Sequence, residues 1–408
     1  MKLYFLLIAQ SCCKAGFCSV LKSLKLLINV KYGTMNFVYL CDFKTAKEWF
    51  SKPEFADRPS WESIKVLEGE RRQNKVSGIV FSNGNPWIYN RRFLVHHLQN
   101  LGMGKSKIEG LIMREVEGLV EEFKGLTKEP SILPKAIHFA VANVIWQLVS
   151  SHRFSLKDEK VQLIRKKLGE ISKSFPPFSF IDFYPVVKYF IPRPVLNYII
   201  GLMKIMLDMF RASNSSTARI IRLFLVYMSS LQEIQERIQK EIDKVVPRDS
   251  LPGLEHRNEL TYLDATINEV LRHSSVLPIG VLRCAAKDVR LEGYDIPKGT
   301  AVISLEAFSH SDPTYFETPN EFNPSRFLDG NGKYFPTCDG FQAFGLGKRQ
   351  CPGEQFARME LYLMISALMQ NFTFAPPDDE GQMSIAPSLE RSFQIPDMEQ
   401  KFKIRLRN

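Results

Sequence analysis

The chain has 408 residues, of which 45% are apolar and 24% charged, and its 54 Lys and Arg against 44 Asp and Glu give a net charge of +10. This is the composition of an ordinary globular protein, which excludes a disordered or collagen-like chain and a small disulfide-stapled protein. The positive charge is spread along the chain without a nucleic-acid motif, so it favours a membrane surface or an acidic partner over nucleic acid.

Residues 1–30 form a short basic and apolar N-terminal segment. The first 41 residues contain five lysines and no acidic residue, and the apolar run 3–9 is too short to cross a bilayer. Two interpretations stay open: a signal-like segment or anchor remnant, and a flexible basic end. The seven cysteines are odd in number and show no C-x-x-C spacing, which suits a reducing compartment.

Apolar residues recur at helical spacing over 108–123 and 231–245, and the spacing predicts one helix in each range. In the first helix, Glu115, Glu117 and Glu121 are predicted to face outward. Between these helices, residues 175–194 are rich in Pro, Phe and Tyr and predict an apolar loop.

Residues 289–303 alternate apolar and polar side chains around Gly293 and Gly299, as β-hairpins do. A turn-rich coil is predicted over 310–347, and a helix from Pro352 to about Gln370. Strands and helices do not alternate regularly, so a doubly wound sheet is disfavoured. The sequence predicts a mainly α protein with a small β-rich region.

The sharpest local pattern is Phe-Gly-Leu-Gly-Lys-Arg-Gln-Cys-Pro-Gly at 344–353. Its glycines permit a tight turn, and Cys351 lies where the next helix is predicted to begin. A helix N-terminus with Lys348 and Arg349 nearby predicts a lowered thiol pKa, which suits an anionic sulfur ligand to a metal. Gly353 would let a flat cofactor approach, and Phe344 could cover the sulfur.

This pattern, together with others in the chain, resembles the cytochrome P450 superfamily of haem-thiolate monooxygenases, and in particular its animal microsomal family 2. The family's cysteine-loop pattern is met at five positions. Glu-Val-Leu-Arg at 269–272 is similar to the family's E-x-x-R, and Phe-Asn-Pro-Ser-Arg-Phe at 322–327 to its later coil motif. Trp-Ile-Tyr-Asn-Arg at 87–91 is similar to the family's W-x-x-x-R.

The resemblance implies a role for each matching residue. Cys351 would be the axial thiolate of haem b, in one helical haem domain spanning 31–408. Contacts with the cofactor would come from Trp87, Arg91, Arg283, Phe344, Arg349 and Gly353. A structural triad of Glu269, Arg272 and Arg326 would brace the cysteine loop.

The same resemblance implies that an oxygen atom from O₂ enters a small lipophilic substrate, with electrons from an NADPH-dependent reductase and with cytochrome b5 as a second candidate donor. It also implies the cytosolic face of the endoplasmic reticulum membrane. Two alternatives stay open: a haem-binding family member that is catalytically impaired or truncated, and a redox-neutral isomerase or dehydratase.

The distal helix departs from the family pattern. The family has Ala-Gly-x-acid-Thr-Thr above the haem, and the aligned residues 212–217 are Ala-Ser-Asn-Ser-Ser-Thr. Ser216 and Thr217 are the candidate catalytic hydroxyls, and Ser215 replaces the acid that normally assists proton delivery. The stretch between Pro185 and Asp208 is also too short for the helical hairpin that usually roofs the substrate pocket.

Overall fold

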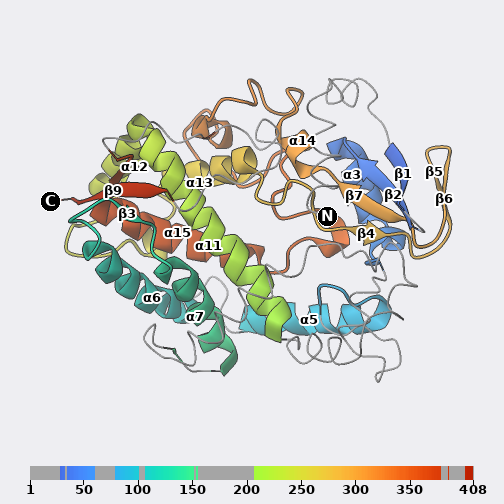
Figure 1. The fold of residues 1–408 in the computed structure, drawn as a ribbon, viewed down its shortest axis with the longest axis horizontal. Helices are drawn as coiled ribbons and strands as arrows, with labels where there is room; N and C mark the ends of the chain where they lie inside the picture. The colour runs from blue at the N-terminus through green and yellow to red at the C-terminus, as the bar shows by residue number, and fades with distance from the viewer. Residues whose placement is uncertain are drawn as a thin grey trace.

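The computed structural model describes residues 28–32, 35–59, 79–100, 106–150, 153–154, 206–377, 385 and 400–407. Helices gather on one side of the molecule, and a small sheet with its own short helix lies on the opposite side (Figure 1). The described part is therefore mainly α, as the sequence predicts.

The helical side is built around α15, which packs against four other helices and is buried along nearly its whole length. Its apolar core includes Phe123 of α6, Phe224 of α11 and Tyr362 of α15, all fully buried. The long helices are α5 (Gly84–Asn100), α6 (Ser106–Lys124), α7 (Ala136–Ser150), α11 (Met206–Ser230), α12 (Gln232–Val245), α13 (Thr261–Ser274) and α15 (Glu354–Asn371).

The largest sheet in the described residues has the strand order β1-β2-β7-β4, and β2 and β7 run parallel although they are far apart in sequence. This pairing places the N-terminal strands beside β7, which belongs to the segment before the cysteine loop. Its strands are β1 (Ile28–Tyr32), β2 (Met35–Leu40), β4 (Arg283–Cys284) and β7 (Ala301–Ser304), and the helices beside it are α3 (Phe43–Ser51) and α14 (Glu306–His310).

Two smaller sheets complete the β structure of the described residues. One has the order β3-β9-β8 and the other is a hairpin, β5-β6. Their strands are β3 (Ser131–Ile132), β5 (Val289–Leu291), β6 (Tyr294–Ile296), β8 (Phe372–Ala375) and β9 (Lys401–Leu406), and the 3₁₀ turns are η1 (Pro53–Phe55), η4 (Leu254–His256), η5 (Pro324–Phe327) and η6 (Gly347–Arg349).

Most of the periodic predictions are confirmed. α6 and α12 cover the two ranges with helical spacing, and β5 and β6 form the predicted hairpin, with Gly293 at a φ of +83° in its turn. The C-terminal helix starts at Glu354 rather than Pro352, because Cys351, Pro352 and Gly353 form a turn that precedes it.

The prediction that Glu115 faces outward is wrong. Its carboxylate is buried and accepts hydrogen bonds from Asn143 (3.2 Å) and Gln147 (3.0 Å) of α7 and from Arg153 (2.7 Å). Side-chain spacing alone gave no sign of these partners, which lie 28 to 38 residues further along the chain. Glu117 and Glu121 are exposed, as predicted.

Several predictions lie outside the described residues: the loop over 175–194, the short stretch after Pro185 and most of the segment 1–30, whose last three residues belong to β1. Among the residues that are described, every helix is too short or too polar to span a membrane.

Glu360 provides a pH test of the core. This residue of α15 is fully buried, neither carboxyl oxygen has a hydrogen-bond partner among the described residues, and burial raises its pKa well above the ordinary value. The folded protein therefore holds a proton that the unfolded chain releases near pH 4.5, and stability falls as the pH rises above that value.

We expect Glu360→Gln to remove this contribution. Above about pH 4.5, the unfolding free energy of the native protein should fall with rising pH relative to the variant, by at most about 1.4 kcal/mol per pH unit, as denaturant titrations would show. Parallel pH profiles for the two proteins would contradict a neutral Glu360.

Candidate functional site

The loop before α15 is a tight turn held against α3. Gly345 and Gly347 have positive φ angles of +74° and +58°, and the Cys351 N–H donates to the Phe344 carbonyl at 2.8 Å. A Cβ on Gly347 would overlap the carbonyl oxygen of Phe50, so only glycine fits this close approach. The backbone of α3 thus fixes the position of the cysteine.

The sequence predicts a lowered pKa for Cys351, and this prediction is wrong when only the protein's own groups act on the thiol. The residue is exposed at the surface, but desolvation by the surrounding atoms and the charge of Glu354 raise the pKa of its thiol, while the Gly353 N–H and the charge of Arg91 act in the opposite direction. Arg349, which the sequence placed near the sulfur, directs its guanidinium elsewhere, to backbone carbonyls. With only the protein's own groups around it, the thiol therefore has a higher pKa than the sequence predicts.

Arg349 links the cysteine loop to the segment before α5. It donates to the carbonyls of Ala56 (2.6 Å), Ile79 (3.1 Å) and Ser82 (2.6 Å), and its guanidinium lies 3.8 Å from the centre of the Trp87 ring. This stacking brings the start of α5 against the loop.

Arg283 and Arg58 also lie near the loop, and both are buried. Arg283 of β4 donates to the carbonyls of Phe50 (3.2 Å) and Leu346 and stacks 3.8 Å from the Phe50 ring. Arg58 donates to the carbonyls of Val80 (3.0 Å), Val281 (2.9 Å) and Leu282. Arg58 belongs to no recognisable sequence pattern, so only the fold reveals its position.

Arg91 completes a cluster of four arginines, with Arg58, Arg283 and Arg349. It donates to the carbonyl of Gln350, next to the cysteine, at 2.6 Å. Burial and mutual repulsion lower the pKa of Arg58 to about 10 and those of Arg283 and Arg349 to about 9. Within the described residues, the cluster donates to neutral oxygen atoms, and none of its members has a carboxylate within ion-pair distance.

A cluster of four cations without paired carboxylates calls for an anion. The indole N–H of Trp87 is buried without a hydrogen-bond partner among the described residues. A Cβ on Gly353 would meet open space. A flat cofactor with carboxylate side chains, beside a cysteine sulfur, matches these features, so the residues fit haem b and its propionates.

The three members of the predicted structural triad lie together. Arg272 forms a bidentate ion pair with Glu269, at 2.7 Å for both contacts, and the two side chains are at most 1% exposed. The Arg326 Nε lies 3.5 Å from the same carboxylate. Arg272 also donates to the carbonyls of His310 (2.6 Å) and Pro319 (2.9 Å), which fixes the coil that leads to the cysteine loop.

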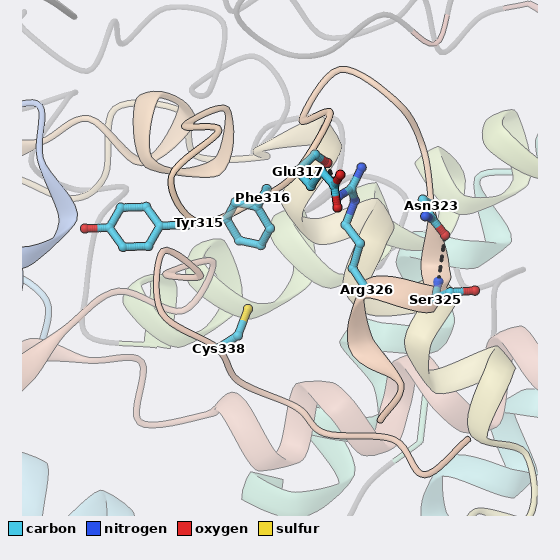
Figure 2. A pocket seen from close by; sticks show the side chains of 7 residues that line it. All are labelled: Tyr315, Phe316, Glu317, Asn323, Ser325, Arg326 and Cys338. Atoms are coloured by element: carbon cyan, nitrogen blue, oxygen red, sulfur yellow. Dashed lines mark hydrogen bonds between the residues drawn. The ribbon is translucent and has the colours of Figure 1, made fainter. Parts of the chain in front are cut away.

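A cavity of about 340 Å³ borders the triad at Arg326, and Figure 2 shows Arg326, Phe316 and Cys338 around it. Its remaining lining residues are Tyr315, Glu317, Asn323 and Ser325. The lining contains neither Cys351 nor a member of the arginine cluster, so this cavity is separate from the candidate cofactor site.

The candidate catalytic hydroxyls lie in the middle of α11. Thr217 is buried and Ser216 is partly buried, and the aligned stretch 212–217 is continuous helix. The side chains of Ser213 and Ser215 lie outside the described part of the structure. Phe344 is partly buried, with its ring 4.7 Å from the Arg358 guanidinium.

Comparison with known proteins agrees with this site. The family model described as Cytochrome P450 matches residues 15–195 and 200–403. The chain is 37% identical to Cytochrome P450 2L1 of Panulirus argus over 87% of this chain and 83% of the relative. It is 31% identical to Cytochrome P450 2J2 of Homo sapiens (75% and 71%) and 32% identical to Cytochrome P450 2C6 of Rattus norvegicus (84% and 79%).

The match to the family model extends over most of the chain and spans the residues of the cysteine loop, the arginine cluster and the ion-paired triad. The chain therefore belongs to the cytochrome P450 family, whose members are oxidoreductases of the monooxygenase type with haem b on a cysteine thiolate.

Proposed function

We propose that this protein inserts one oxygen atom from O₂ into a small lipophilic substrate, with electrons from an NADPH-dependent reductase. The observation that carries the proposal is the cluster of four arginines around the loop of Cys351, which forms no ion pair with a carboxylate of the described residues. Residues 31–408 form the haem-thiolate domain in this proposal. When bound, haem on a thiolate supplies the activation of O₂.

Each residue of the site has one task in the proposal. Cys351 provides the thiolate ligand, and Phe344 shields its sulfur. The indole N–H of Trp87 donates to a propionate, and Gly353 leaves room for the macrocycle. The propionate charges are balanced by Arg58, Arg91, Arg283 and Arg349. Arginine suits this role because its guanidinium stays charged and binds carboxylates with two N–H groups.

The triad of Glu269, Arg272 and Arg326 is a brace in this proposal. The guanidinium groups of both arginines donate to backbone carbonyls of the coil that precedes the cysteine, and the buried Glu269 carboxylate holds the two arginines together. It holds the coil and takes no part in chemistry.

On the distal side, Ser216 and Thr217 hold water and pass protons toward the cofactor face. The stretch 212–217 has no carboxylate, which favours a second candidate function. A redox-neutral isomerase or dehydratase needs neither a proton relay nor outside electrons, and a member that binds haem but turns over poorly fits the same observation.

Substrate class and partners follow from surface chemistry. Leu277 and Val281, on the segment after α13, are 46% and 47% exposed and offer apolar contacts to a lipophilic substrate. Lys348 is exposed beside the cysteine and suits an acidic reductase, and cytochrome b5 is a second candidate electron donor. The basic N-terminal residues suit the cytosolic face of the endoplasmic reticulum membrane.

Reconstitution with an NADPH-dependent reductase tests the proposed activity. We expect NADPH- and O₂-dependent hydroxylation of a lipophilic probe, and we expect Thr217→Ala to divert electrons to hydrogen peroxide. Stable haem without NADPH-driven product would refute the monooxygenase proposal. Turnover of an organic hydroperoxide without reductase would then identify the redox-neutral alternative.

Trp87→Phe tests the cofactor contact. The ring under Arg349 is kept, while the N–H is lost, so haem should dissociate about ten- to hundredfold faster to an apomyoglobin trap. Trp49→Phe is the matched control, because it removes an N–H from a buried tryptophan packed on Phe55. Equal haem dissociation in the two variants would contradict the assigned contact.

A further inference from the structure

The start of the cysteine loop is fixed at Gln342, two residues before Phe344. Three polar groups of Gln342 hold it in place: its N–H donates to His310 Nε2 at 3.1 Å, its carbonyl accepts from the Gly345 N–H at 2.7 Å, and its side-chain oxygen accepts from the Ser304 hydroxyl at 3.0 Å. Gln342 is 3% exposed. The residue is therefore clamped through both its backbone and its side chain.

His310 has one defined tautomer in this arrangement. A backbone N–H can only donate, so Nε2 accepts from Gln342 and the ring proton lies on Nδ1. Nδ1 lies 2.9 Å from the Ser275 hydroxyl, which in turn donates to the Arg272 carbonyl at 2.9 Å. Burial, with the nearby charge of Arg272, lowers the pKa of His310 to about 3, so the ring is neutral at physiological pH.

These bonds form a directional chain from Gln342 through His310 and Ser275 to Arg272. Arg272 closes the connection by donating to the His310 carbonyl at 2.6 Å. Ser275 ends α13 with a left-handed φ of 40°, which places its hydroxyl between the ring and the helix end. All four residues are buried, where each hydrogen bond resists exchange with water. The end of α13 is thus connected to Gln342, two residues before the loop begins.

We propose that His310 and Gln342 are positioning residues for the sulfur ligand: they hold the segment whose Phe344 carbonyl accepts the Cys351 N–H. This inference rests on the proposed function of Cys351. Ser304 gives the loop a second, independent hold from the end of β7. Neither residue touches the cofactor in this proposal, because both act through the backbone of 342–345.

The test compares three variants of the haem-loaded protein. His310→Phe keeps a ring against Phe341, with which His310 stacks at 5.6 Å, but removes both nitrogens. Ser304→Ala removes the side-chain hold on Gln342. Ser366→Ala is the control, since it removes a fully buried hydroxyl that bonds within α15, to the Leu363 carbonyl.

The readout is the reduced, CO-bound spectrum followed over time in mild denaturant, with the unfolding midpoint measured beside it. We expect the thiolate-type Soret band to decay about tenfold faster in His310→Phe and Ser304→Ala than in Ser366→Ala, at matched distance from each midpoint. Decay at the rate of the control would overturn the inference. If His310→Phe does not fold, Ser304→Ala decides alone. A native protein without a thiolate-type band would instead refute the proposed function itself.

Discussion

Glu269→Gln is expected to lower the free energy of unfolding by about 3–5 kcal/mol, because it leaves the buried guanidinium of Arg272 and the partly buried guanidinium of Arg326 without their carboxylate. Arg272 contacts Glu269 through two hydrogen bonds of 2.7 Å, and Arg326 lies 3.5 Å away. The Asn323 N–H also loses a charged acceptor, now 2.9 Å away. Equilibrium denaturation with a fluorescence signal measures the loss.

Glu121→Gln is the matched control for this prediction. Its partner Lys124 is also three residues away on a helix and also in close contact, at 2.6 Å, but both side chains are exposed. Such a surface pair contributes about 0–1 kcal/mol. A loss for Glu269→Gln no greater than that of the control would show that the triad does not brace the fold.

Alanine substitutions at two glycines of the cysteine loop are expected to have different effects on stability. Gly347→Ala should cost about 2–5 kcal/mol of stability, because its positive φ disfavours a side chain and its Cβ would overlap the Phe50 carbonyl. The backbone of α3 has little freedom to retreat, so the cysteine loop should move and thiolate ligation should be lost.

Gly353→Ala should leave the stability of the cofactor-free protein within about 0.5 kcal/mol, since its φ is −100° and nothing lies within 4 Å of its Cβ. Haem should nevertheless bind more weakly, because the new methyl group occupies the space assigned to the macrocycle. Titration of the apoprotein with hemin measures this. Undiminished haem affinity in Gly353→Ala would place the cofactor on another face of the turn.

Local patterns in the sequence predicted those parts of the fold that depend on neighbouring residues. Helical spacing located α6 and α12, and turn residues located the β5-β6 hairpin. The cysteine loop was identified because its glycines, cations and cysteine lie within ten residues. In each case the residues that form the pattern lie within one helix, one hairpin or one loop.

Contacts between distant segments could not be predicted in this way. The spacing within α6 predicted Glu115 at the surface. Its partners lie on another helix, α7, and that spacing carries no information about them. Arg58 joins the arginine cluster only because β2 and β7 pair in parallel and bring the start of the chain to the cysteine loop. The hydrogen bond between Gln342 and His310 joins residues 32 positions apart, and no local spacing in the sequence links the two.

The pKa of Cys351 shows a different limit. Sequence proximity suggested that Lys348 and Arg349 would stabilise a thiolate, but the fold turns Arg349 toward the carbonyls of Ala56 and Ser82. Desolvation by the surrounding atoms then has the largest effect and raises the thiol pKa, although the residue is exposed at the surface. A cation that lies close to a thiol in the sequence therefore need not stabilise its thiolate in the folded protein.

The reduced, CO-bound absorption spectrum of the purified protein, recorded beside that of Cys351→Ala, tests whether Cys351 binds haem. If Cys351 is the axial ligand of haem b, the native protein shows a thiolate-type Soret band and the variant lacks it. A native spectrum without that band, or a variant that retains it, would contradict the assignment of Cys351 as the haem ligand.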